Sequence, residues 1–174
     1  MLAHNARMQA SDTPAPHSLR AATPADVPAI VGLIHELAVY EQLSHRVQVT
    51  PQSLHPHLFG ARPVAEAVVV EVAGTVVAFA LFFTNFSTFL GKPGLYLEDL
   101  YVQPAHRRTG LGRALLQHLA ALAVLRDCGR FEWSVLDWNT TAIAFYERRG
   151  ATLMADWRIC RVTDEALLAL AQTA

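Results

Sequence analysis

The fold of this chain is decided by a stretch that reads Leu95-Tyr96-Leu97-Glu98-Asp99-Leu100-Tyr101-Val102 and then Arg107-Arg108-Thr109-Gly110-Leu111-Gly112. The first part is mostly apolar and predicts a buried strand, which Pro104 ends. After the second part, leucines recur at helical spacing and predict a helix that runs to about Arg126. The two glycines at the junction let backbone N–H groups converge on an anion at the start of that helix.

Three arginines, Arg107, Arg108 and Arg113, add positive charge around this junction, as a pyrophosphate site requires. The stretch is not a P-loop, because no Gly-Lys-Ser/Thr follows the glycines. It is not a full dinucleotide fingerprint either, because the third glycine is missing. Taken alone, the stretch fits a phosphate site and an ordinary strand–turn–helix connection equally well.

Composition limits the remaining possibilities. The 174 residues, 52% of them hydrophobic, predict one domain over residues 18–174 and a disordered tail over residues 1–17. Fourteen basic and fifteen acidic residues give a net charge of −1, so we expect no nucleic-acid partner. The only two cysteines, Cys128 and Cys160, lack metal-site spacing, which predicts no metal and a reducing cytoplasm. No apolar run is long enough to cross a membrane.

Helical and strand patterns alternate along the whole length, which predicts a mixed α/β (α+β) fold. Alternating or continuous apolar runs predict strands, and residues with 3.6-fold apolar spacing predict helices. The expected strands are 18–22, 67–72, 76–83, 95–102, 131–136 and 157–162. The expected helices are 24–37, 51–58, 111–126, 140–149 and 164–171, with a hairpin turn at 73–75 and a loop at 85–94.

The order strand, Arg-x-x-Gly-x-Gly, helix, strand, Asn-x-x-Ala-x-x-Phe-Tyr, Gly resembles the GCN5-related N-acetyltransferases (GNAT). Within that family, segments 36–41, 96–102, 136–139 and 145–151 resemble the diamine acetyltransferase branch, which acts on spermidine, spermine or thialysine. The resemblance covers roughly residues 18–170. It implies a mixed, mostly antiparallel sheet flanked by helices, in which two central strands splay apart and acetyl-CoA binds as co-substrate between them.

The resemblance also implies which residues hold acetyl-CoA. The turn and the helix start would bind the pyrophosphate, and the end of the preceding strand would pair with the pantetheine amides and polarise the thioester carbonyl. Asn139 is expected to contact the same molecule and to cap the helix that follows it. Arg108 stands where members of this branch usually carry glycine, so a positive φ there would be strained. The implied cofactor-binding set is Leu100, Tyr101, Val102, Arg107, Arg108, Thr109, Gly110, Leu111, Gly112, Arg113 and Asn139.

Tyr146 is the expected general acid. Attack of an amine on a thioester expels a thiolate, and a phenol of pKa ~10 can protonate a thiolate whose acid has a pKa of ~8.5 at contact distance. From its spacing alone, Tyr146 reads as a core aromatic at the end of an amphipathic helix. The Phe-Tyr-x-x-x-Gly match to the family favours the catalytic role.

Glu98 and Asp99 are unusual in an apolar strand. A buried carboxylate needs an ion-pair or hydrogen-bond partner, so each could form a structural ion pair. The resemblance favours Glu98 as the group that holds the substrate amine or accepts its proton, and leaves both interpretations of Asp99 open. Tyr40 and Glu41 either contact a distal amine of the substrate or form an ordinary helix end.

These features predict an acetyl-CoA-dependent N-acetyltransferase that acts on a small cationic amine by direct transfer. The expected loop carries Ser87, Thr88 and Phe89 where polyamine-specific members have an acidic residue and a tryptophan, which favours thialysine-like diamines over spermine. The alternatives are a non-catalytic acyl-CoA-binding or sensor domain and an acetyltransferase of protein amines. By resemblance we expect a homodimer, whereas the free cysteines predict a cytoplasmic location and the short apolar runs predict no membrane association.

Overall fold

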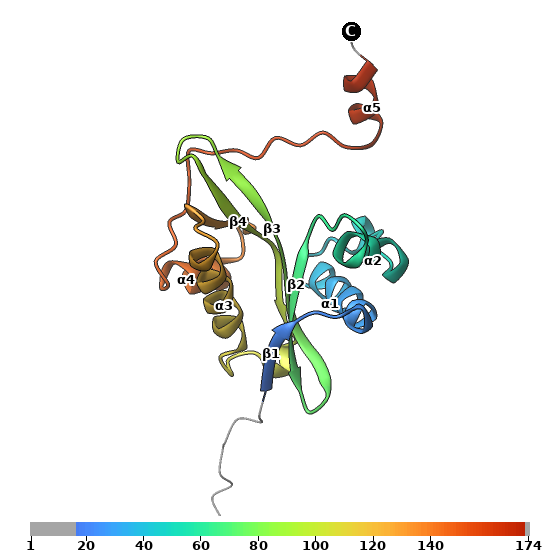
Figure 1. The fold of residues 1–174 in the computed structure, drawn as a ribbon, viewed down its shortest axis with the longest axis vertical. Helices are drawn as coiled ribbons and strands as arrows, with labels where there is room; N and C mark the ends of the chain where they lie inside the picture. The colour runs from blue at the N-terminus through green and yellow to red at the C-terminus, as the bar shows by residue number, and fades with distance from the viewer. Residues whose placement is uncertain (1–16, 173–174) are drawn as a thin grey trace, which may run out of the picture. The chain divides into compact units, whose positions relative to one another are not determined.

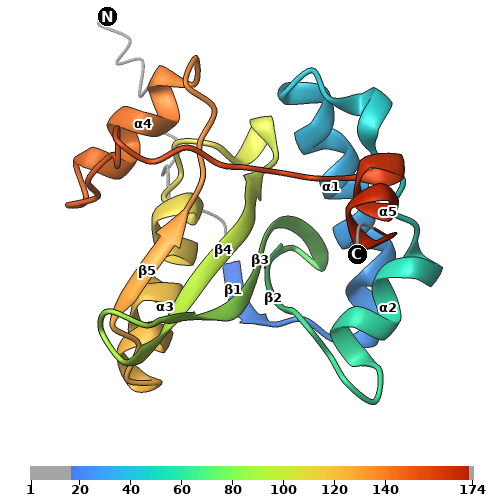
Figure 2. The same ribbon diagram turned by 90° about the horizontal axis from the view of Figure 1, so that it is seen from above.

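The computed structural model describes residues 17–172, so the tail predicted for residues 1–17 lies outside the described part except for His17. Figures 1 and 2 together label the helices and strands. The first half contains β1 (His17–Ala21), α1 (Val27–Tyr40), α2 (Pro51–Phe59), β2 (Glu66–Val72) and β3 (Thr75–Ser87). The second half contains β4 (Lys92–Val102), α3 (Leu111–Leu125), β5 (Arg130–Trp133), α4 (Thr140–Glu147) and α5 (Asp164–Gln172).

The five strands form one mixed sheet in the order β1-β2-β3-β4-β5. The first four strands pair antiparallel, and β5 pairs parallel to β4. Ala73 and Gly74 both have positive φ and close the tight turn between β2 and β3, at the place where the sequence predicts a hairpin. The predicted α/β (α+β) class with a mostly antiparallel sheet is therefore confirmed.

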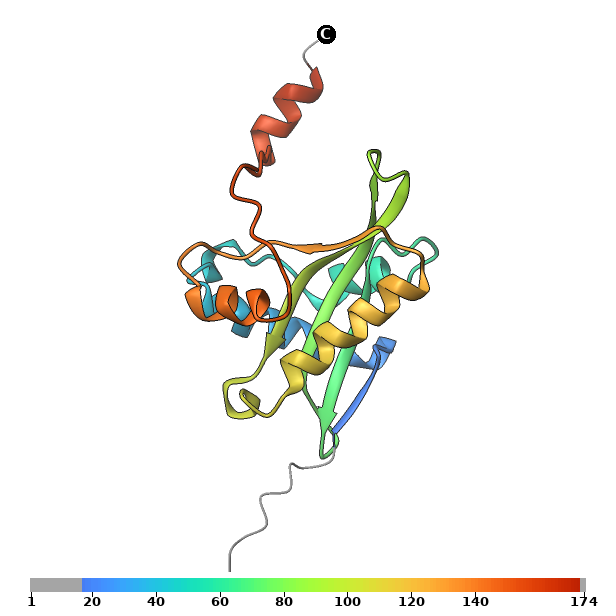
Figure 3. The same cartoon turned by 90° about the vertical axis from the view of Figure 1, so that its left-hand side faces the viewer.

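Helices cover both faces of this sheet (Figures 1 and 2). On one face, apolar residues of α1 and α2 pack against β2, β3 and β4 in a cluster that includes Ile30, Leu54, Phe79 and Tyr101. On the other face, α3 lies across the sheet (Figure 3) and buries Leu111, Leu115 and Leu119. The sheet is thus fixed on both sides, and its strand ends are held at defined positions.

A β-bulge at Glu98 interrupts the pairing of β3 and β4. Leu81 pairs with Asp99 and the next residue, Phe82, pairs with Leu97, so Glu98 is the extra residue. Regular alternation predicts Leu97 and Asp99 on the same face. Because paired residues of antiparallel strands share a face, the bulge instead places Asp99 with Leu81 toward α1 and Leu97 with Phe82 toward α3.

The β4–β5 pair is short. It begins at Gly94 with Arg130 and ends at Leu97 with Trp133, whereas β4 continues to Val102. From Glu98 onward, no described strand pairs with this edge of β4. This edge of β4 is therefore open, whereas the splaying of two central strands stays a prediction, because β5 is the edge strand of the described sheet.

Two predictions about the second half of the chain are wrong. The loop expected at 85–94 is only 88–91, because β3 and β4 stay paired to Ser87 and Lys92. The strand expected at 157–162 does not form, and its residues are exposed, with Trp157 at 71%. A strand needs backbone partners as well as an apolar pattern, and no described strand pairs with this segment.

Contacts divide the chain into two compact units that meet between Ser134 and Val135. The first unit contains the whole sheet with α1, α2 and α3. The second unit contains α4 and α5, and from Thr152 to Gln172 every residue is exposed. A single domain over residues 18–174 stays a prediction.

Candidate active site

The turn before α3 has the geometry of an anion site. Gly110 has a φ of 96°, and α3 starts at the next residue without a side-chain cap. The first N–H groups of a helix have no partner within it and carry the positive end of the helix dipole. The side chains of Arg108 and Arg113 are exposed beside them. An anion placed here would meet several unpaired donors.

Arg108 adopts the left-handed conformation, with a φ of 66°. The sequence predicts strain at this position if the turn requires a positive φ, and the turn does require it. A non-glycine residue in this region is disfavoured by contact between its Cβ atom and the backbone. The strain lies directly at the candidate anion site.

The free edge of β4 lies next to this turn in the chain. The Gln103 N–H donates to the Val77 carbonyl of β3 at 3.0 Å, so the Val102 carbonyl of the same peptide bond points to the opposite edge. Strand alternation then directs the peptide groups of Leu100 outward and those of Tyr101 toward β3. Of the three residues expected to pair with pantetheine, only Leu100 and Val102 present backbone groups at the free edge.

The structure brings together three predicted substrate residues, Glu41, Glu98 and Asp99. Removal from water raises the pKa of Asp99 to about 6, and the negative charges of Glu98 and Glu41 contribute to the shift. Burial also raises the pKa of Glu41. Within residues 17–172 no ion pair involves any of these three carboxylates. The structural ion pair that the sequence left open for Asp99 is therefore not formed.

A second cluster joins α1 to β4 and to the turn. The guanidinium of Arg107 lies 4.9 Å from the ring centre of Tyr40 and 5.4 Å from that of Tyr101. The Gln103 side-chain amide donates to Glu36 at 2.8 Å. Sequence reasoning missed Glu36 and Gln103, although Glu36 lies one helical turn before the predicted Tyr40.

Two predicted site residues lie in the second unit. Asn139 caps α4 as expected, because its side-chain oxygen accepts a hydrogen bond from the Ala142 N–H at 3.2 Å. Tyr146, on the last turn of α4, is half-buried and packs edge-on against Phe145 with ring centres 5.3 Å apart. Tyr146 is thus not fully enclosed as a core aromatic would be, and its catalytic role stays a prediction.

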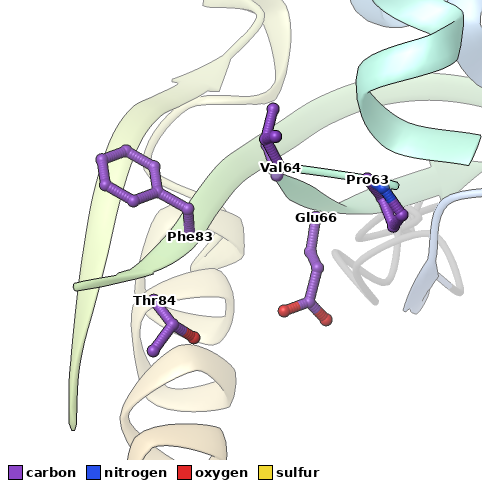
Figure 4. A pocket seen from close by; sticks show the side chains of 6 residues that line it. Pro63, Val64, Glu66, Phe83 and Thr84 are labelled. Atoms are coloured by element: carbon purple, nitrogen blue, oxygen red, sulfur yellow. The ribbon is translucent and has the colours of Figure 1, made fainter. Parts of the chain in front are cut away.

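A separate cavity of about 340 Å³ lies between the start of β2 and the side chains of Phe83 and Thr84 (Figure 4). Glu66 is its only charged lining residue, and both of its oxygens accept hydrogen bonds from Arg126. A carboxylate paired in this way offers no free charge to a cationic substrate. In this respect the cavity differs from Glu41, Glu98 and Asp99, which have no ion-pair partner within residues 17–172.

None of the helices within residues 17–172 is long and apolar enough to cross a membrane. In the same residues, no group of three or more histidine, cysteine, aspartate or glutamate side chains is arranged to hold a metal ion.

Comparison with known proteins gives a consistent result. Residues 33–151 match the model of the acetyltransferase (GNAT) family. The chain is 35% identical to an L-ornithine N5-acetyltransferase of Arabidopsis thaliana, over 87% of this chain and 86% of that protein. It is 33% identical to a thialysine N-epsilon-acetyltransferase of Mus musculus, over 88% of this chain and 96% of that protein.

Solved structures agree. An integron cassette protein from the mobile metagenome of V. cholerae superimposes with a TM-score of 0.76 at 25% identity, covering 90% of this chain and 98% of that one. A ribosomal-protein-alanine N-acetyltransferase of Brucella melitensis shares the fold, with a TM-score of 0.67 at 24% identity over 86% of this chain and all of that one. With its turn, its open strand edge and these relatives, the chain belongs to the GNAT family of acetyltransferases.

Proposed function

We propose that this enzyme transfers an acetyl group from acetyl-CoA directly to a primary amine of a small diamine or a diamino acid. The observation that carries the proposal is the group of three carboxylates, Glu41, Glu98 and Asp99, beside the free edge of β4. A cationic amine would neutralise these charges. The named relatives, an ornithine and a thialysine acetyltransferase, act on amino acids that carry a second amine.

The cofactor half of the site uses backbone groups. The N–H groups at the start of α3, together with Arg108 and Arg113, would hold the pyrophosphate. The outward N–H groups of Leu100 and Val102 would bind the pantetheine arm, and one of them would polarise the thioester carbonyl. Asn139 and Thr109 are proposed as further contacts to CoA on the family resemblance.

The amine half must bind an ammonium group and then remove a proton from it. Asp99 suits this second task, because a carboxyl whose pKa is about 6 is ionised at neutral pH and is a stronger base than an ordinary aspartate. Glu98 is exposed at the bulge and would attract the cation. Tyr40 and Glu41 at the end of α1 would contact the distal group of the substrate.

Tyr146 is proposed as the acid that protonates the departing thiolate of CoA. The proposal rests on the Phe-Tyr-x-x-x-Gly match and on the partial exposure of the side chain. In this scheme the amine attacks the thioester carbon, the C–S bond breaks, and the sulfur takes the Tyr146 proton. The bound ammonium loses one proton to Asp99 before the attack, and Asp99 passes it to water; after the attack the nitrogen loses a second proton, which returns through water to Tyr146. Because the amine itself attacks the thioester, no acetylated enzyme forms.

One experiment tests the whole proposal. Purified protein is incubated with acetyl-CoA and a panel of amines, and free thiol is followed. The panel contains L-ornithine, thialysine, 1,3-diaminopropane, spermidine, spermine and a lysine-containing peptide. We expect the diamino acids and the short diamine to give higher kcat/KM than spermine, and the intact mass of the enzyme to stay unchanged when acetyl-CoA is present without amine.

Each other outcome points to a different conclusion. A kcat/KM for spermine well above those of all short amines would overturn the expected substrate ranking. Turnover of the peptide alone would identify an acetyltransferase of protein amines. CoA binding without turnover on any amine would identify a non-catalytic acyl-CoA sensor. An acetylated enzyme would exclude direct transfer.

Two further properties are proposed, a homodimeric state on the family resemblance and a location in the cytoplasm on the free cysteines Cys128 and Cys160. Light scattering coupled to size-exclusion chromatography measures the first, and a fluorescent fusion imaged in cells measures the second.

A further inference from the structure

The three arginines of the cofactor turn differ in what their side chains contact. All three are exposed, but no ring stacks on Arg108 or Arg113 within residues 17–172. Arg107 turns back toward the sheet, where its guanidinium approaches the rings of Tyr40 and Tyr101. A residue that served only to attract phosphate would not need this arrangement.

Arg107 also binds the backbone of the open strand. Its Nε–H donates to the Val102 carbonyl at 2.9 Å. That carbonyl lies on the free edge of β4, beside the N–H groups proposed to bind the pantetheine arm. Arg107 therefore fixes the last peptide of the open edge and sets where the turn leaves the strand.

The ring partners of Arg107 come from two different elements. Tyr101 is buried in β4, and Tyr40 is partly exposed on the last turn of α1, directly before Glu41. Glu36, one turn earlier, accepts a hydrogen bond from Gln103 and raises the pKa of Tyr101 through its charge and a hydrogen bond, after the larger effect of burial. The end of α1 is thus attached to the end of β4 at two points.

We infer that Arg107 is a positioning residue that couples the acetyl-CoA turn to the amine-binding end of α1, through its simultaneous contact with Tyr40, Tyr101 and the Val102 carbonyl. The inference rests on the proposed function of the two sites that it joins. Lysine carries the same charge as arginine but lacks the planar guanidinium and the Nε–H group. The coupling therefore depends on the shape of the side chain and not on its charge alone.

A double-mutant cycle tests the inference through CoA binding in the absence of any amine. The variants are Arg107→Lys, Tyr40→Leu and the combination, and the readout is the Kd for CoA by calorimetry. We expect each single substitution to weaken CoA binding about two- to fivefold, the range of an exposed cation–π contact. The combination should be no weaker than the worse single variant.

Two controls sharpen the cycle. Tyr40→Phe keeps the ring and should leave the Kd for CoA within about twofold of the parent. Arg108→Lys changes an arginine that has no ring partner. In the double variant with Tyr40→Leu, the two fold-changes in the Kd for CoA should therefore multiply. Multiplicative effects for Arg107→Lys and Tyr40→Leu, or an unchanged Kd in Tyr40→Leu, would overturn the inference.

A second readout separates this inference from the proposed function. The same cycle is repeated on urea unfolding, where the contact predicts non-additive shifts of the midpoint whether or not CoA binds. Parent protein that binds no CoA would contradict the proposed function. Additive midpoint shifts would show that Arg107 and Tyr40 do not interact, whatever the enzyme binds.

Discussion

Asp26, at the start of α1, and Asp99, in the middle of β4, are both withdrawn from water, yet their surroundings are opposite. Asp26 is 6% exposed and accepts hydrogen bonds from two nitrogens of Arg20, at 2.7 and 2.9 Å, and from the N–H and hydroxyl of Thr23. Asp99 has no cation in range within residues 17–172 and faces the charges of Glu98 and Glu41.

The two environments move the pKa in opposite directions. The Arg20 guanidinium holds the pKa of Asp26 well below its usual range, whereas burial and like charge raise the pKa of Asp99 to about 6. The Asp26 carboxylate has hydrogen-bond and ion-pair partners in the folded state, and these contacts stabilise the fold. Asp99 has no ion-pair partner within residues 17–172 and its ionised form is disfavoured, which costs stability, and a carboxylate with a pKa raised in this way is suited to binding or catalysis. Four measurements test this contrast between Asp26 and Asp99, and a fifth tests Tyr146, the proposed proton donor.

The largest effect is expected on catalysis. Asp99→Asn removes the proposed base and should lower kcat/KM for the preferred amine about 10²- to 10³-fold. The Kd for CoA measured by calorimetry should stay unchanged. Asp26→Asn is the matched control and should keep kcat near that of the parent. Equal losses of kcat/KM in the two variants would show that Asp99 has no special role in catalysis.

Tyr146→Phe tests the proposed general acid, which would donate a proton to the CoA thiolate. We expect kcat to fall about 10²-fold, because the thiolate would leave without general acid catalysis, while the CoA affinity and the melting temperature stay constant. Steady-state kinetics at saturating acetyl-CoA measure the loss. Unchanged turnover would make Tyr146 a packing residue.

Asp26→Asn should lower the free energy of unfolding by about 2–3 kcal/mol at pH 7, because the buried carboxylate loses its charge while Arg20 keeps its own. A carboxyl with a depressed pKa stabilises the fold above its unfolded pKa of ~3.9, and this contribution disappears as the pH falls through the folded pKa. The difference in unfolding free energy between variant and parent, measured by urea titration, should therefore shrink progressively as the pH falls below about 4. A difference in unfolding free energy that stays constant down to pH 2 would show that the Asp26–Arg20 ion pair does not cause the loss of stability.

Asp99→Asn should have the opposite effect on stability. The folded state binds the Asp99 proton more tightly than the unfolded chain, so the parent loses stability as the pH rises from about 4 to 6 and stays lower above that window. The variant cannot ionise and should be about 1–2 kcal/mol more stable than the parent at pH 8. At pH 4 the gain should vanish, which thermal unfolding at the two pH values will show.

The smallest expected effect is in the pH profile of the parent enzyme. Asp99 must be ionised to accept a proton, so log kcat/KM should fall with a slope of about one below pH 6, in addition to any titration of the amine. Asp99→Asn should lose this limb of the profile. A limb that persists in the variant would assign the titration to another group.

The sequence alone predicted most of what depends on neighbouring residues. The turn with Gly110, the cap at Asn139 and the hairpin at Gly74 depend on local backbone preferences, and all three are in the structure. The strain at Arg108 was predictable for the same reason. The members of the candidate site were also named in advance, except for Glu36 and Gln103, because the family motifs lie within continuous segments.

Only the tertiary structure decided the surroundings of those residues. The bulge at Glu98 arises from the register between β3 and β4, and it moved Asp99 to the face of α1, where Glu41 lies nearby. The segment 157–162 has a strand pattern but pairs with no described strand, so it forms no strand and is exposed. Local patterns fix turns and caps, whereas charge environment and strand pairing depend on which distant segments the fold brings into contact.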